Sequence, residues 1–285
     1  MSDAQVMQEG VAQGADGVRL IYATSEFKEG KPWIVLIIPF GLRLAVAKPF
    51  FEFFEPQYNV VSWEARLILS PDDAPAPPGA FELQRHVADF DTIVTACKIR
   101  KCVVVGYCSG AGVALGVANR YPQRISQLVL VHGEYVLLNE PGCTTQFARE
   151  VDGLLTMAHT DENHLRKIYE KLKSDRLDAG GHRPQGMDVP FSEIAFLRRH
   201  AQNYLAYKKS DFLKLARFVS HRTLLMTGKR DAQANMASTE KIKSVMPNAK
   251  LYVDDTADHY GILREDSSTL ITLWNHLCEQ RMQYG

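Results

Sequence analysis

The sequence CVVVGYCSGAGVAL, residues 102–115, contains the pattern from which the architecture of this chain can be worked out. The β-branched run before Gly106 predicts a buried strand, and the small and apolar residues after Ser109 predict a helix. Glycine stands two residues before and two residues after Cys108, which lets a strand and a helix approach each other closely around one sharply turned residue. A turn centred on Ser109 would put Tyr107 at the first of these positions, where its side chain would clash. The pattern therefore predicts a strand, a tight turn at Cys108 and a helix.

Strands and helices are predicted to alternate on both sides of this turn. Strand-like patterns cover residues 18–25, 33–38, 58–63, 127–132, 223–228 and 250–253, and helical patterns cover residues 42–54, 81–99, 236–245 and 267–282. Between residues 134 and 219 the pattern is helical, with a break at residues 178–186. Alternating strands and helices form mostly parallel sheets. The sequence thus predicts an α/β protein with a mostly parallel central sheet and helices on both faces, made of residues 1–133 and 220–285, and a mainly helical cap inserted at residues 134–219.

Two polar residues downstream of Cys108 follow predicted strands. Asp231 lies just past the strand at 223–228, and His259 lies in the loop after the last strand, 28 positions further on. An activated nucleophile needs a base to take its proton, and the base needs a group that holds it in place. Glu134, just after the strand at 127–132, is the reserve candidate for that orienting acid.

The glycine-flanked turn, followed by an acid and then a histidine, resembles the α/β-hydrolase fold superfamily. The resemblance extends from about Val18 to the last helix, which is nearly the whole chain. It implies an α/β-hydrolase fold in which Cys108 is the nucleophile, His259 the general base and acid, and Asp231 the group that holds the imidazole. Most of the family has a serine hydroxyl where this chain has a thiol.

The same resemblance implies two backbone donors for an oxyanion hole. One is the N–H of Ser109, the residue after the nucleophile, and the other matches Leu42, next to Gly41, in the loop after the strand at 33–38. The family usually has His-Gly in this loop, whereas this chain has Phe40-Gly41. A phenylalanine cannot make the hydrogen bonds of that histidine, so this loop is where the chain departs from the family pattern.

A thiol at the nucleophile position bears on the reaction. An acyl group on sulfur remains an activated thioester, which reacts well with amines and thiols and comparatively slowly with water. His259 and the N-terminus of the helix that follows Cys108 are expected to favour the thiolate form of Cys108. Family members with cysteine at this turn include polyhydroxyalkanoate synthases, dienelactone hydrolase and thioesterase-like proteins of natural-product pathways. The resemblance therefore implies a thioesterase-like acyltransferase or acyl-releasing enzyme of a biosynthetic pathway, whose small-molecule acyl substrate is presented on an acyl or peptidyl carrier protein or on coenzyme A.

Two alternatives stay open at this point. One is a cysteine-dependent hydrolase of an ester, a lactone or a carbon–carbon bond, and the other is a non-catalytic ligand-binding member of the fold. We expect no cofactor and no metal, because no Cys and His residues are grouped with the spacing of zinc ligands. A phosphate-binding loop ending at Lys229 is excluded, since Thr223 stands where that motif needs glycine.

Composition narrows the possible partners. The 285 residues are enough for one large α/β domain or two small ones. The 33 Lys and Arg residues balance 33 Asp and Glu residues, so we expect no nucleic acid partner. No apolar run reaches the roughly 20 residues that span a bilayer, and residues 1–10 lack the features of a secretory signal. Five cysteines without framework spacing are then expected to be reduced thiols in a cytoplasmic protein.

Overall fold

The computed structural model describes residues 6–70, 72, 74–178, 184–265 and 267–284. At its centre is a sheet of eight strands in the order β1-β2-β4-β3-β5-β6-β7-β8. The pairs β1–β2 and β2–β4 are antiparallel, and the other pairs are parallel. The strands are β1 (Gln8–Gln13), β2 (Arg19–Thr24), β3 (Trp33–Ile37), β4 (Asn59–Trp63), β5 (Cys102–Tyr107), β6 (Ile125–Val131), β7 (Thr223–Gly228) and β8 (Ala249–Asp254). The predicted α/β class with a mostly parallel sheet is confirmed.

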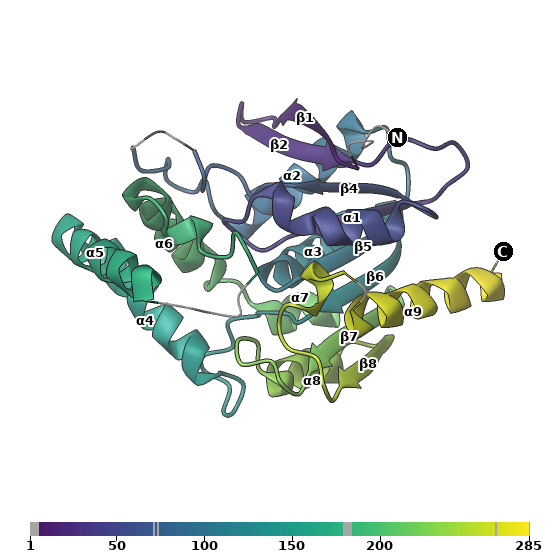
Figure 1. Ribbon diagram of the computed structural model, residues 1–285. Coiled ribbons are helices and arrows are strands. Elements are labelled where there is room, and N and C mark those ends of the chain that lie inside the picture. The colour runs from purple at the N-terminus through teal and green to yellow at the C-terminus, as the bar shows by residue number, and fades with distance from the viewer. Residues whose placement is uncertain (1–5, 71, 73, 179–183, 266, 285) are drawn as a thin grey trace.

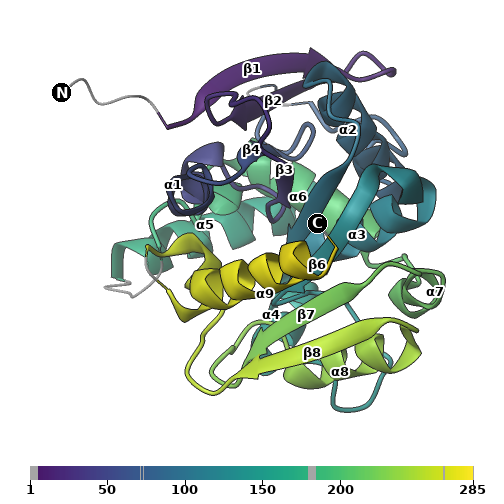
Figure 2. The same cartoon turned by 90° about the vertical axis from the view of Figure 1, so that its right-hand side faces the viewer.

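Helices cover both faces of this sheet, and Figure 2 shows α1 and α9 on the side opposite α2 and α3. One face carries α2 (Leu83–Ala96), α3 (Ser109–Arg120), α7 (Phe212–Arg217) and α8 (Met236–Val245), and the other carries α1 (Lys48–Phe54) and α9 (Ser268–Tyr284). The reason is visible in β5: Val103 and Val105 pack on the side of α1 and α9, and Val104 packs on the side of α2 and α3. A strand that is apolar on both faces has to be covered on both.

The remaining helices lie at one end of the sheet, beside the strand ends (Figure 1). They are α4 (Gln146–Thr160), α5 (Glu162–Asp178) and α6 (Ile194–Tyr207), and they share a small apolar cluster of their own that includes Leu155, Leu165 and Leu197. We call α4, α5 and α6 the cap helices. The last helix of the predicted insertion, α7, packs instead beside α3 and α8. Of the predicted break at residues 178–186, residues 179–183 lie outside the described residues.

Strand β1 is absent from the sequence-based prediction. It occupies the edge of the sheet and pairs only with β2, and Ala12 is its single buried residue. An edge strand that is mostly exposed has little apolar alternation to detect.

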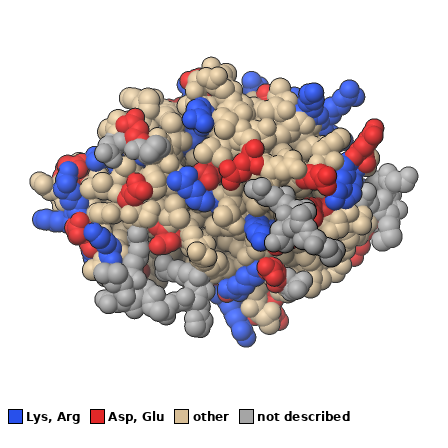
Figure 3. Space-filling model, turned by 45° about the horizontal axis from the view of Figure 1, so that its top comes forward, with Lys and Arg blue, Asp and Glu red and all other residues tan. Residues whose placement is uncertain are grey.

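The distribution of charge on the surface, the hydrophobicity of the helices and the state of the cysteines can be read from the structure. On the face seen in Figure 3, basic and acidic side chains are interspersed. Within the described ranges, no helix is both long and apolar enough to cross a membrane. All five cysteines are free thiols.

Candidate active site

Cys108 occupies the sharp turn between β5 and α3. Its backbone has φ 52° and ψ −122°, a conformation that residues other than glycine rarely adopt. The turn is held by backbone hydrogen bonds, from the Cys108 N–H to the Val131 carbonyl at 3.0 Å and from the Ala111 N–H to the Cys108 carbonyl at 3.0 Å. The strained residue therefore presents its side chain at the carboxyl end of the central strand and the first turn of a helix.

The two glycines around Cys108 are required by close packing. A Cβ atom on Gly110 would lie 2.1 Å from the carbonyl oxygen of Ile37, at the end of β3. A Cβ atom on Gly106 would lie 2.7 Å from the Cα atom of Ala111, within α3. Both contacts are to backbone that cannot move aside. The structure thus agrees with the sequence that glycine is needed at both positions because a strand and a helix approach each other closely there.

His259 lines the cavity that contains Cys108, and Asp231 contacts its imidazole. The Nδ1 atom of His259 lies 2.9 Å from Oδ2 of Asp231, and the Tyr107 hydroxyl donates to the His259 carbonyl at 3.0 Å. Burial disfavours a charged His259, but the negative charge of Cys108 and hydrogen bonds with Asp231 and Cys108 outweigh burial and raise the pKa of the imidazole well above its ordinary value. This geometry favours an imidazolium next to the sulfur.

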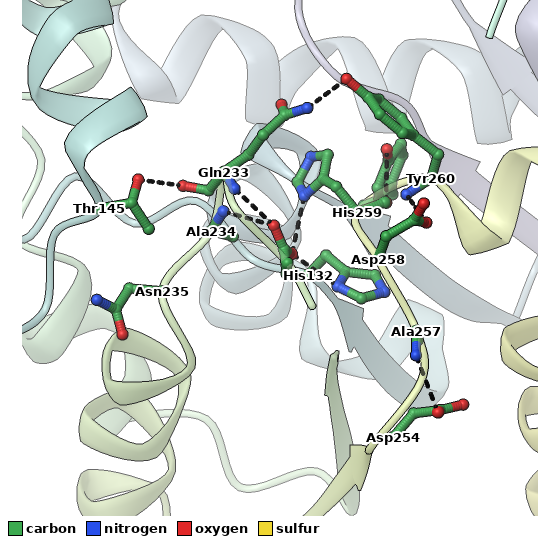
Figure 4. Close-up of polar contacts among 12 residues, drawn as sticks. His132, Thr145, Gln233, Ala234, Asn235, Asp254, Ala257, Asp258, His259 and Tyr260 are labelled. Carbon is green, nitrogen blue, oxygen red and sulfur yellow. Dashed lines mark hydrogen bonds and ion pairs between the residues drawn. The ribbon is translucent and has the colours of Figure 1, made fainter. Parts of the chain in front are cut away.

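Asp231 also holds a second histidine. His132, in a left-handed conformation (φ 48°) just past β6, places its Nδ1 atom 2.8 Å from the same Oδ2 atom of Asp231. Figure 4 shows both rings, each joined by a dashed line to the shared carboxylate. The other oxygen, Oδ1, accepts hydrogen bonds from the N–H groups of Gln233 at 2.8 Å and Ala234 at 2.9 Å. Burial alone would raise the pKa of Asp231, but the hydrogen bonds from His132 and His259 hold it well below its usual value.

His132, Asp231 and His259 are also close enough together to be considered as metal ligands, since their donor atoms lie within 4.8 Å of one another. The separations of 2.8 and 2.9 Å between each Nδ1 and Oδ2 are hydrogen-bond distances. Two ligand atoms on a tetrahedral zinc ion lie about 3.3 Å apart. The arrangement therefore fits a carboxylate that orients two imidazoles better than it fits a metal centre.

The loop after β3 is fastened to the nucleophile turn by a hydrogen bond. The Phe40 N–H donates to the Ser109 hydroxyl at 3.1 Å, and Gly41 turns the chain with φ +78°. Leu42 follows and lines the same cavity as Cys108 and Ser109. Ser109 and Leu42, the residues expected to supply the backbone donors, thus both line the cavity that contains the thiol.

This cavity lies between the turn and the cap helices and has about 180 Å³ of open space. Its apolar walls come from the β3 loop, the segment after β6 and the cap, and they include Leu42, Val136, Phe147, Val151, Leu155 and Phe191. Pockets for drug-sized ligands usually measure about 300–1,000 Å³, so this one suits a small acyl group rather than a long chain. Among the described residues, two buried atoms in its wall have no hydrogen-bond partner, Nδ1 of His200 and Nδ2 of Asn203.

Cap helix α6 is tied directly to the nucleophile turn. The Tyr207 hydroxyl lies 3.0 Å from the carbonyl oxygen of Ser109 and 2.7 Å from that of Glu134. A Cβ atom on Gly112 would lie 2.0 Å from the same hydroxyl, so glycine is required there as well. Contacts at the nucleophile turn therefore help to position the cap.

Glu134, the reserve acid, points elsewhere. Its side chain lines the cavity and accepts a hydrogen bond from the Val136 N–H at 3.0 Å, and it does not bond to His259. Burial raises the pKa of Glu134 to about 7, although the hydrogen bond from Val136 and the charge of His259 lower it. Asp231 is the carboxylate that contacts the imidazole.

Replacing Glu134 by glutamine is expected to stabilise the protein above pH 7. The folded-state pKa of about 7 lies above the ordinary value of 4.5, so the folded protein binds a proton more tightly and loses stability as the pH rises through this window. Glutamine keeps the shape and the acceptor for Val136 without the charge. Urea unfolding should show the variant gaining about 2 kcal/mol over wild type between pH 5 and pH 8, after allowance for partial exposure. A difference that is constant across this range would contradict the expectation.

His132 is the residue of this site that sequence reasoning missed. The sequence places it at the end of a predicted strand. The signal that could have found it is strand order: β6 lies between β5 and β7 in the sheet, and the candidates Cys108 and Asp231 follow those two strands. The carboxyl ends of adjacent parallel strands meet at one edge, so a polar residue at the end of β6 had to lie between Cys108 and Asp231.

Comparisons with known proteins agree with the architecture. The family model described as alpha/beta hydrolase fold matches residues 70–266. L-allo-isoleucyltransferase of Pseudomonas savastanoi pv. glycinea is 22% identical over 264 residues, which are 90% of this chain and 90% of that protein. Among solved structures, a hydrolase from Pseudomonas aeruginosa PA01 has a TM-score of 0.71 at 19% identity, covering 96% of this chain and 99% of its own. The enol-lactonase from Burkholderia xenovorans LB400 has a TM-score of 0.69 at 18% identity, covering 94% and 100%.

Proposed function

Because the chain belongs to the alpha/beta hydrolase fold family, we propose that it is an acyltransferase that works through an acyl-thioester on Cys108. The observation that carries the proposal is the thiol at the strained turn, which lines a mostly apolar cavity together with His259, whose imidazole contacts Asp231. A nucleophile, a base and an orienting acid are what covalent acyl transfer requires.

In the first half-reaction the Cys108 thiolate attacks the carbonyl carbon of an acyl thioester. The oxyanion that forms accepts hydrogen bonds from the backbone N–H groups of Ser109 and Leu42 in this proposal. When the intermediate collapses, the bond between the carbonyl carbon and the donor sulfur breaks, and the imidazolium of His259 protonates the departing thiolate. The products are acyl-Cys108 and the free donor thiol.

In the second half-reaction an acceptor nucleophile enters. Neutral His259 takes its proton as it attacks the acyl-Cys108 carbonyl, and collapse returns the thiolate of Cys108 beside the imidazolium. With a thiol acceptor, the second half-reaction moves the acyl group from the sulfur of Cys108 to another sulfur, so one thioester is exchanged for another. The exchange is then close to thermoneutral, so acceptor binding sets the direction of transfer.

Two observations favour transfer over plain hydrolysis. A thioester keeps the acyl group activated toward thiols and amines, and the cap helices contribute to the mostly apolar walls of the cavity beside Cys108. The relative that aligns over 90% of the chain is named as a transferase of an aminoacyl group, L-allo-isoleucyl. We infer that the acyl group is small, that an aminoacyl group is the first class to test, and that a carrier protein or coenzyme A presents it in the cytoplasm.

Intact-mass measurement tests the proposal. The protein is incubated with N-acetylcysteamine and coenzyme A thioesters of short acyl and aminoacyl groups, and then with a second thiol. We expect a mass gain equal to one acyl group on Cys108, and loss of that mass to the added thiol at least about 10-fold faster than to water. This is the behaviour of a transferase with a covalent intermediate.

Three other outcomes would overturn it. If the acyl mass is lost equally fast with and without the thiol, the protein is a cysteine-dependent hydrolase. If chromogenic esters or lactones turn over while thioesters do not, the substrate class is wrong. If no acyl group is accepted from any donor, the chain is a ligand-binding member of the fold.

A further inference from the structure

Glu134 is a carboxylate for which acyl transfer by Cys108, His259 and Asp231 supplies no task. It lies in the wall of the cavity that contains Cys108, and its side chain accepts a hydrogen bond at Oε1 from the Val136 N–H at 3.0 Å. No lysine or arginine within the described ranges forms an ion pair with it. A carboxylate in a largely apolar cavity without a lysine or arginine partner is costly, and such groups mark functional positions.

The position of Glu134 relative to the nucleophile is fixed by backbone contacts. Its N–H donates to the carbonyl of Cys108 at 3.1 Å, and its own carbonyl lies 2.7 Å from the Tyr207 hydroxyl. The same hydroxyl lies 3.0 Å from the carbonyl of Ser109. Glu134 is therefore held directly beside the residues that would bind the reacting carbonyl group.

The surroundings of the carboxylate suit a cation. Tyr204 and Tyr207 line the same cavity, and burial raises the pKa of both phenols, helped by the charge of Asp152 at Tyr204 and of Glu134 at Tyr207. The ammonium group of Lys208 lies 5.4 Å from the centre of the Tyr204 ring. Aromatic rings and a carboxylate are the groups that bind ammonium ions in partly closed sites. Burial raises the pKa of Glu134 itself to about 7, and a positive charge in the cavity would stabilise its ionised form.

We propose that Glu134 selects aminoacyl groups by accepting the α-ammonium group of the substrate that acylates Cys108. In an aminoacyl thioester the ammonium group is on the carbon next to the carbonyl that the thiolate attacks. A carboxylate that contacts this ammonium must therefore lie next to the nucleophile, as Glu134 does. The inference rests on the proposed acyl transfer, and it names the group that the site recognises.

The test uses the full-length protein and compares three thioesters whose acyl groups have the same carbon skeleton. They are the N-acetylcysteamine thioesters of L-leucine, of 2-hydroxy-4-methylpentanoic acid and of 4-methylpentanoic acid, which differ only in the group at the α-carbon. Rates of Cys108 acylation are measured by intact mass at pH 7 for wild type, Glu134→Gln and Glu134→Asp. Glu140→Gln is the matched control, because Glu140 is in the same segment but pairs with Lys241 outside the cavity.

We expect wild type and Glu140→Gln to prefer the aminoacyl thioester over the 4-methylpentanoyl thioester by at least about 30-fold, the range for a buried charge pair. In Glu134→Gln this preference should fall to within about 3-fold, and Glu134→Asp should lie between, because it retains the charge at a greater distance. The ratio of two substrates on one protein is insensitive to a change in the amount of folded enzyme.

The inference is wrong if wild type acylates equally with all three thioesters, or if Glu134→Gln keeps the wild-type preference. It is also wrong if the hydroxyacyl thioester matches the aminoacyl one, since Glu134 would then act as a neutral hydrogen-bonding acid. In each of these cases acylation of Cys108 itself leaves the proposed function standing. If none of the three thioesters acylates wild type, the proposed function and this inference fail together.

Discussion

Replacing Cys108 by alanine is expected to abolish acylation of the protein and to lower transfer by at least about 10⁴-fold, to the background of the uncatalysed exchange. The methyl group leaves the turn, the cavity and the histidines in place but removes the atom that forms the covalent bond. Intact mass after exposure to an acyl thioester measures the first effect, and the rate of exchange between two thiols measures the second. Unchanged activity would mean that the turn has been assigned the wrong role.

The control for this variant is Cys97→Ala. Cys97 is a partly exposed thiol that follows α2, and burial raises its pKa to about 11, so it is not expected to accept acyl groups. It should leave both the mass gain and the rate as in wild type. A mass gain that survives in Cys108→Ala but is lost in Cys97→Ala would move the reactive thiol to Cys97.

Serine at position 108 separates transfer from hydrolysis. A hydroxyl at a site arranged for a thiolate is a poorer nucleophile, and its ester is less activated than a thioester. Transfer to a thiol should therefore fall more than hydrolysis does. If both activities rise together in Cys108→Ser, the thiol is incidental and the ordinary hydrolase chemistry of the fold applies.

The sequence predicts the fold well because its signals are local. The run from Cys102 to Val105 is apolar on both faces, and the structure buries it in the middle of a sheet covered on both sides. The glycines at 106 and 110 are explained by contacts of 2.7 and 2.1 Å to backbone, which the spacing alone indicated. Strand β1 is missed because an exposed edge strand does not have to alternate.

The candidate site is predictable in part, for a topological reason. Cys108, Asp231 and His259 each follow a strand, and parallel strands end at one edge, so their meeting follows from the order of elements. His132 shares Asp231 with His259 through hydrogen bonds that depend on ring orientation at distances of 2.8 and 2.9 Å. Which carboxylate faces the imidazole depends on the same detail, and this is why Glu134 remained a candidate from the sequence.

The cavity is the least predictable part. Its walls combine the β3 loop, the segment after β6 and two cap helices, and Tyr207 approaches Ser109 across 98 positions of sequence. Helical periodicity shows that α6 has an apolar face but not which surface that face covers. The walls of the cavity determine which groups fit in it. The sequence therefore indicates a class of reaction but not the substrate.

Replacing Asp231 by asparagine is expected to lower acylation of Cys108 by about 10²–10⁴-fold. In wild type Oδ2 accepts hydrogen bonds from two imidazoles and Oδ1 accepts them from two backbone N–H groups. An asparagine amide has one acceptor oxygen and one NH₂ group, so whichever way it turns, donors face donors. If the NH₂ group faces His259, the ring is driven to the tautomer whose Nε2 carries the proton, and it can no longer take one from the nucleophile.

The pH profile distinguishes this cause from a general loss of structure. Asp231 is one of the groups that raise the pKa of His259, so the imidazolium of the variant should lose its proton at a lower pH. The alkaline limb of the acylation rate should therefore move to lower pH in Asp231→Asn. Asp255→Asn, which changes an exposed carboxylate paired with Lys229, should keep the wild-type profile. A variant that loses rate without any shift of this limb would show that Asp231 supports the fold of the loop rather than the state of the imidazole.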